Sequence, residues 1–167
     1  MKHSASVVID LGGGDRVLQE YGQDFGLVEF CESQGMQPLG LFFCGPEMDD
    51  FEHILRIWRA GYFRSSRSVL VFNEHLVPSG RTPAGAFDDI RARPELTELV
   101  EGGMRPMRVG RLPCMPQVRA SGLTLLEAAG SGRDGKVLDP VRQFMVKQWI
   151  TKVQGEFERI GAAEWLP

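Results

Sequence analysis

The feature that most constrains the fold is an alternation of short apolar runs with longer segments of helical spacing. The runs are "SVVIDL", "PLGLFFCG" and "RSVLVFNE", at residues 6–11, 38–45 and 67–74. Between them, apolar residues recur every three or four positions, which is typical of an amphipathic helix. Strands that alternate with helices pair in parallel through right-handed crossovers. The sequence therefore predicts a three-layer α/β/α fold in which a mostly parallel sheet lies between helices.

Start and stop signals place the remaining elements. Residues 47–61 have acidic side chains near their start and end at a glycine, which predicts a helix. Residues 86–103 have helical spacing on either side of Pro94, and residues 105–115, which lie between prolines, predict an edge or terminal strand. Residues 139–160 begin with a capping aspartate and a proline and carry an apolar stripe. They predict a long helix whose apolar face packs on the sheet.

Length and composition indicate one globular domain that spans residues 1–167. The chain is 43% hydrophobic and 25% charged, and its net charge of -3 gives no general attraction to nucleic acid or to an anionic membrane. DNA therefore stays a possible partner only through a local basic patch, and a solvated face is the more common role for such residues. The arginines that could form this patch are Arg56, Arg59, Arg64 and Arg67.

The cysteines and the hydropathy pattern indicate the compartment. The three cysteines are far apart and lack the spacing of a zinc site, and the sequence contains no signal peptide and no apolar run of membrane-spanning length. We expect a reduced, cytoplasmic protein without membrane contact.

The first apolar run ends in an unusual motif. Asp10 stands at the end of the predicted strand, glycines fill positions 12–14, and residues 15–35 have helical spacing. A carboxylate at the carboxyl end of a parallel strand faces the crevice where such sheets bind ligands, and glycines let backbone N–H groups approach an anion. In this interpretation Asp10 holds Mg²⁺ through water. The alternative for so short a motif is a tight turn in which Asp10 caps the helix.

The order of the motifs resembles the later two-thirds of the ParA/MinD/CobQ-type deviant Walker ATPases. "VVIDLGGGD" stands at the place of the Walker B strand, and "LGLFFCGPEMDDFEHILRIW" at the next strand and helix. "SVLVFNE" is similar to the strand whose asparagine faces the adenine, and "VGRLPCMPQVRASGLTLLEAA" to the segment after the last core strand. The resemblance covers roughly residues 6–130, and its order is more specific than any single motif.

This resemblance implies ATP and Mg²⁺ as cofactors and assigns site residues. Asp10 would serve the Mg²⁺ water shell, and Gly12 and Gly13 would approach the terminal phosphate. Asn73 would contact the base, and the loop that begins at Leu112 and Pro113 would form the other wall of the base pocket. Family members use ATP hydrolysis to drive dimerisation in plasmid partition, conjugal transfer or related processes.

One departure from the family is severe. The 167 residues contain no glycine-rich loop that ends in Gly-Lys-Ser/Thr, which in the family lies upstream of the Walker B strand. Either the chain is a fragment or the fold has lost its phosphate loop, and ATP should then bind weakly unless that loop is supplied. A first strand without its usual neighbour would also present an unpaired edge, so we expect self-association.

Two other functions stay open. "DLGGG" also resembles the phosphate-binding turn of actin-like and exopolyphosphatase proteins, although no second hairpin strand follows it. Alternatively, the scaffold serves as a non-catalytic interaction module that binds a partner protein or DNA after loss of hydrolysis.

Overall fold

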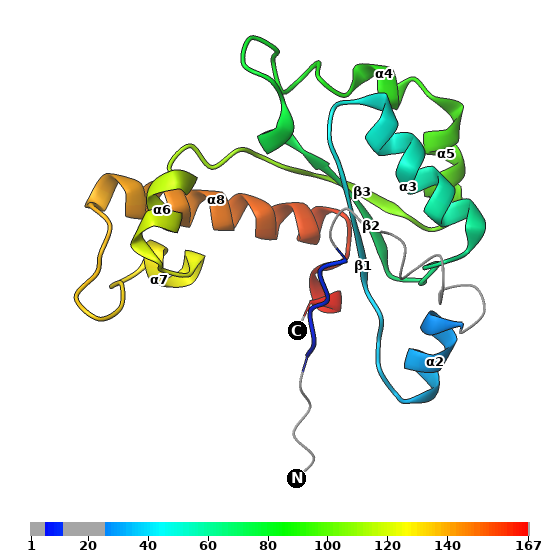
Figure 1. The fold of residues 1–167 in the computed structure, drawn as a ribbon, viewed down its shortest axis with the longest axis horizontal. Helices are drawn as coiled ribbons and strands as arrows, with labels where there is room; N and C mark the ends of the chain where they lie inside the picture. Colours follow the sequence, from blue (N-terminus) through cyan, green and yellow to red (C-terminus); the bar gives the residue numbers. More distant parts are fainter. Residues whose placement is uncertain (1–5, 12–25, 167) are drawn as a thin grey trace.

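The computed structural model describes residues 6–11 and 26–166. Three strands and several helices follow one another in the described chain (Figure 1). In order they are α2 (Leu27–Ser33), β1 (Gly40–Cys44), α3 (Met48–Ala60), β2 (Ser68–Asn73), the 3₁₀ turn η1 (Glu74–Leu76), α4 (Asp88–Arg91), α5 (Pro94–Glu101), β3 (Arg105–Val109), α6 (Met115–Ser121), α7 (Leu125–Ala129), α8 (Pro140–Arg159) and the 3₁₀ turn η2 (Ala163–Trp165).

The strands form one parallel sheet in the order β1-β2-β3. Leu41 lies beside Val69, and Val71 lies beside Met107. Helix α3 connects β1 to β2, and α4 and α5 lie between β2 and β3, so both connections are the helical crossovers that parallel pairing requires. The predicted α/β architecture with a parallel sheet is confirmed for these strands.

Helices cover both faces of the sheet. On one face, Leu70 and Phe72 pack with Phe51 and Trp58 of α3 and with Leu99 of α5. The opposite face packs against the C-terminal part of the chain, and the residues buried there are Val69, Val71, Met107, Phe157 and Ala162. The sheet is therefore the middle of three layers, and α8 provides much of the third (Figure 1).

Helix α8 packs on two different partners. Its start is capped as predicted, because the Asp139 side chain accepts a hydrogen bond from the backbone N–H of Arg142. Its N-terminal half packs through Val146 against α6 and α7, and only its C-terminal half, with Phe157, contacts the sheet. The prediction that the whole apolar stripe faces the sheet is therefore wrong for the first half, where Phe144 is exposed.

The prediction of a buried strand at residues 6–11 is also wrong. These residues form neither strand nor helix, and Val7, Val8 and Ile9 are 79%, 92% and 72% exposed. The apolar pattern indicates residues that favour a pleated, buried surface. A strand forms only where a neighbouring strand supplies backbone hydrogen bonds and other side chains cover it. At Val7, Val8 and Ile9 such cover is missing, because these side chains are largely exposed. The predicted helix over residues 15–35 lies largely outside the described residues, and its described part is α2.

Candidate functional site

The structure describes only some of the residues assigned from the ATPase resemblance. Asp10 is exposed and lies outside any strand, whereas the prediction placed it at the end of one. Gly12 and Gly13 lie outside the described residues. The assignments that can be compared with the sheet are therefore Asn73, Leu112 and Pro113.

Asn73 ends β2 and lies beside Val109, the last residue of β3. Its side-chain oxygen accepts a hydrogen bond from the backbone N–H of His75 at 3.1 Å and thereby caps η1. An asparagine that bonds the backbone two residues ahead stabilises its own turn. One half of the amide that would recognise a base is thus used locally.

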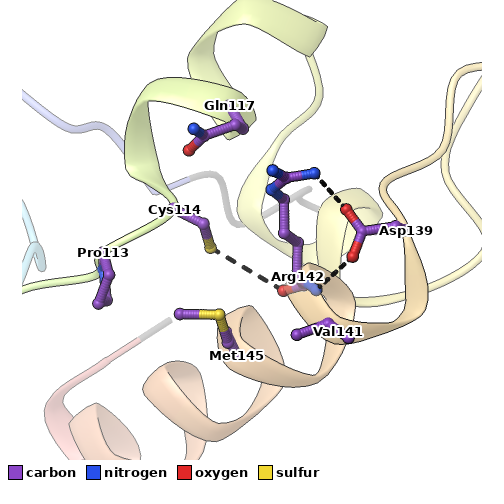
Figure 2. Close-up of a pocket in the computed structure, with 7 residues that line it drawn as sticks. All are labelled: Pro113, Cys114, Gln117, Asp139, Val141, Arg142 and Met145. Carbon is purple, nitrogen blue, oxygen red and sulfur yellow. Dashed lines mark hydrogen bonds and ion pairs between the residues drawn. The ribbon is translucent and has the colours of Figure 1, made fainter.

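Leu112 and Pro113 point to different environments. Leu112 is buried in the cluster formed by α6, α7 and α8. Pro113 lines a groove of about 340 Å³ between the starts of α6 and α8, shown in Figure 2. The groove is lined by Pro113, Cys114, Gln117, Asp139, Val141, Arg142 and Met145. Asn73 is not among these residues, and the base pocket stays a prediction.

Polar groups in the groove are engaged with one another. The Asp139 carboxylate accepts from the Arg142 backbone N–H and also pairs with the Arg142 guanidinium (Figure 2). These contacts, the backbone hydrogen bond foremost, lower the pKa of Asp139. The Cys114 thiol lies 4.0 Å from the Arg142 carbonyl oxygen, to which it donates weakly. The groove thus has an apolar wall and one acidic group that already serves as a helix cap.

The carboxyl ends of β2 and β3 are occupied by an ion pair. Arg108 and Glu74 approach to 2.7 Å, and the same guanidinium donates to the Pro83 carbonyl at 2.7 Å. Open parallel sheets commonly bind ligands at this position. Here the ion pair ties β3 to the turn that follows β2, which gives the crevice a structural role.

The described residues offer little for metal or nucleophilic chemistry. No group of three or more histidine, cysteine, aspartate or glutamate side chains in residues 6–11 and 26–166 could hold a metal ion. Burial, with a smaller effect of Asp50, raises the pKa of the Cys44 thiol to about 12. A thiol with so high a pKa is protonated at neutral pH and is a poor nucleophile.

The arginines that could have met DNA contact the protein itself. Arg59 forms an ion pair with Glu98 of α5, and this contact raises the pKa of Arg59. Arg67 donates to the side chain of Gln37, and Arg64 lies 5.0 Å from the centre of the Trp58 ring. These contacts favour the solvated-face interpretation.

The two edges of the sheet differ sharply, and this contrast is the most informative feature of the surface. The outer edge of β3 is capped by α8: the Glu156 carboxylate accepts from the Arg108 backbone N–H at 3.0 Å, and Arg159 donates to the Pro106 carbonyl at 3.2 Å. Pro106 itself has no N–H to offer. Capping of this kind prevents a sheet edge from pairing with another chain.

The outer edge of β1 has no such protection within the described residues. The Gly40 N–H donates to the Arg67 carbonyl on the β2 side, so alternation along the strand directs the backbone groups of Leu41 and Phe43 outward. No described strand pairs with that edge. The side chains of Leu41 and Phe43 lie on the same sheet face as Val69 and Val71, beyond the cover of α8, and are 41% and 57% exposed.

Sequence reasoning missed this open edge, although a signal was present. The strand "GLFFC" contains no charged residue and no proline, which are the usual means of protecting an edge strand. The capping of β3 could not be predicted from the sequence pattern, because it joins Glu156 to Arg108 and these residues are 48 positions apart.

Comparison with protein-family models, with curated proteins and with solved structures gave no match to this chain. The likeness to deviant Walker ATPases therefore stays a hypothesis from the sequence. Within the described residues, no helix combines the length and the apolar character needed to cross a membrane.

Proposed function

We propose that this chain is a non-catalytic interaction module that binds an extended strand at the outer edge of β1. The observation that carries the proposal is the contrast between the two sheet edges. One is capped by Glu156 and Arg159, and the other, beside Leu41 and Phe43, pairs with no strand among the described residues. An open edge supplies backbone hydrogen bonds to any extended peptide, and neighbouring side chains supply selectivity.

The chemistry of the edge defines the partner strand. Leu41 and Phe43 present exposed apolar surface on one face of the sheet, while Phe42 is turned into the core on the other. A strand added beside them would therefore place apolar side chains at alternate positions on the Leu41 and Phe43 side. Charged side chains at those positions would lose water without gaining a partner, so the edge selects against them.

Fluorescence anisotropy with labelled six-residue peptides tests this proposal. The panel contains peptides with valine or isoleucine at alternate positions and matched peptides with a central proline, which cannot complete the ladder. We expect binding of the first set to the intact chain and at least a tenfold weaker affinity for the Phe43→Lys variant. Leu126→Lys, at an exposed apolar position on α7, is the matched control. Binding that is equal in both variants, or absent throughout, would contradict the proposal.

Nucleotide binding is the second candidate. It is favoured by the parallel order of β1, β2 and β3 with Asn73 at a carboxyl end, which agrees with the resemblance to deviant Walker ATPases. Without a phosphate-binding loop in the 167 residues, we expect weak affinity for Mg-ATP. Calorimetry that gives a micromolar dissociation constant, lost in Asn73→Ala, would favour this function over the first.

A further inference from the structure

The chain contains a strand donor as well as a strand acceptor. The acceptor is the outer edge of β1, with Leu41 and Phe43 exposed beside it. The donor is the 6–11 segment, whose apolar side chains are exposed to water. Exposed apolar segments of this kind have high β-propensity and are prone to pair with an available edge.

The pattern of the donor matches the acceptor. Alternate side chains of a strand lie on opposite faces of the sheet, so Val7, Ile9 and Leu11 would share one face. That face can lie against Leu41 and Phe43, which also share one face at the end of the sheet. The other face of the segment carries Ser6, Val8 and Asp10, of which two are polar. The segment of six residues is also long enough to pair with the five residues of β1.

We propose that two copies of this chain exchange the 6–11 segment, so that the segment of each copy adds as a strand to β1 of the other. This inference rests on the proposed function, and it names a second copy of the chain as the partner. The copy's own segment does not fill the edge in this structure, since Val8 is 92% exposed and the segment contains no strand. The 6–11 segment of one copy would therefore cover the β1 edge of the other copy.

Such an exchange is self-complementary. A twofold axis relates the two copies, and each contributes the same donor and the same acceptor. Each sheet then gains one strand beside β1, and Leu41 and Phe43 are covered by Val7 and Ile9 of the second copy. No charged group lies among these four side chains, so no unpaired charge is buried on assembly.

Light scattering coupled to gel filtration measures the expected mass, using the full chain over a range of concentrations. We expect twice the 18.6 kDa mass of one chain. Phe43→Lys damages the acceptor and Ile9→Lys damages the donor, and each should reduce the mass to that of one chain. The control Leu126→Lys changes a comparably exposed apolar residue on α7 and should leave the dimer intact. A cooperative melt of each variant establishes that it is folded.

Mixing the two damaged variants separates exchange from other modes of association. Phe43→Lys keeps an intact donor and Ile9→Lys keeps an intact acceptor, so the mixture should recover a heterodimer with one exchanged strand. No recovery, or a dimer that both substitutions leave unchanged, would overturn the exchange. If the chain is monomeric but still binds the peptides described above, the exchange is overturned and the proposed function stands. If the chain is monomeric and binds no peptide, both are overturned.

Discussion

Glu156 gives the sharpest test of how α8 protects the sheet. Its carboxylate accepts a hydrogen bond from the backbone N–H of Arg108 on the outer edge of β3, and it also pairs with Arg159. Glu156→Ala removes both contacts and leaves the Arg108 N–H without its acceptor. A hydrogen bond to a charged group contributes about 1.5–3 kcal/mol, and a half-exposed ion pair adds between about 0 and 1 kcal/mol.

The exposure of the groups sets the expected value within that range. The Glu156 side chain is 28% exposed and the Arg159 side chain is 56% exposed, so water weakens the ion pair more than the contact to the backbone. We therefore expect Glu156→Ala to lower the free energy of unfolding by about 2 kcal/mol, of which most comes from the lost acceptor. For a chain of this size, that loss lowers the melting temperature by about 4 to 8 °C.

The pH dependence of the effect has a definite sign. The Arg159 hydrogen bond foremost, with the Arg108 N–H, lowers the pKa of Glu156 in the folded protein. The stabilisation is therefore fully present above the ordinary glutamate pKa, and it is lost as pH falls through the lowered folded value. The difference between the intact chain and Glu156→Ala should be largest at neutral pH and should shrink in acid.

Urea unfolding at pH 7 and in acid measures this difference, with Glu158→Ala as the control. Glu158 is an exposed glutamate on the same helix, so its variant matches the change in charge and helix propensity. A Glu156→Ala variant as stable as the control at pH 7, or a difference that stays constant into acid, would refute the role of the carboxylate as an edge cap.

Three further outcomes follow from local contacts. Leu99 is fully buried under α5, so Leu99→Ala creates a cavity there and should lower the free energy of unfolding in urea by about 2–5 kcal/mol. Val100→Ala, at an exposed position on the same helix, is the control. Thr124→Ala removes the acceptor of the capping box with Glu127 and should lower stability by about 1 kcal/mol, and a loss near zero would contradict the cap. Burial raises the pKa of the Cys44 thiol to about 12, so Cys44 should resist a thiol reagent until the protein unfolds. Peptide mapping that finds Cys44 itself rapidly labelled in the native chain would contradict its burial, whereas Cys31 is only partly buried.

Local signals predicted the central elements well. Gly61 ends α3 in the left-handed conformation at φ 75°, and Asp139 caps α8. Both could be predicted because each effect depends on residues within one helical turn. The strands β1, β2 and β3 were also predicted, since short apolar runs between helices leave few other options. For these elements the sequence pattern and the tertiary environment agree.

The errors concern partners that lie far away in the sequence. The 6–11 segment has the composition of a buried strand, but burial depends on whether a neighbour covers it, which periodicity does not report. The first half of α8 packs on α6 and α7, and its periodicity does not report which neighbour covers its apolar side. The base contact assigned to Asn73 through resemblance stays a prediction, and the side chain also bonds the His75 N–H, the ordinary use of asparagine in a turn.

The two sheet edges also determine how large an assembly can become. Because Glu156 and Arg159 cap β3, the part of the chain that the structure describes offers one acceptor edge, at β1, and one donor, the 6–11 segment. An open series of copies leaves one donor and one acceptor unsatisfied at its ends. A reciprocal pair satisfies both, and its second strand binds within an already formed complex, where the effective concentration reaches the millimolar range. At dilute concentrations the closed dimer is therefore favoured over a growing chain of copies.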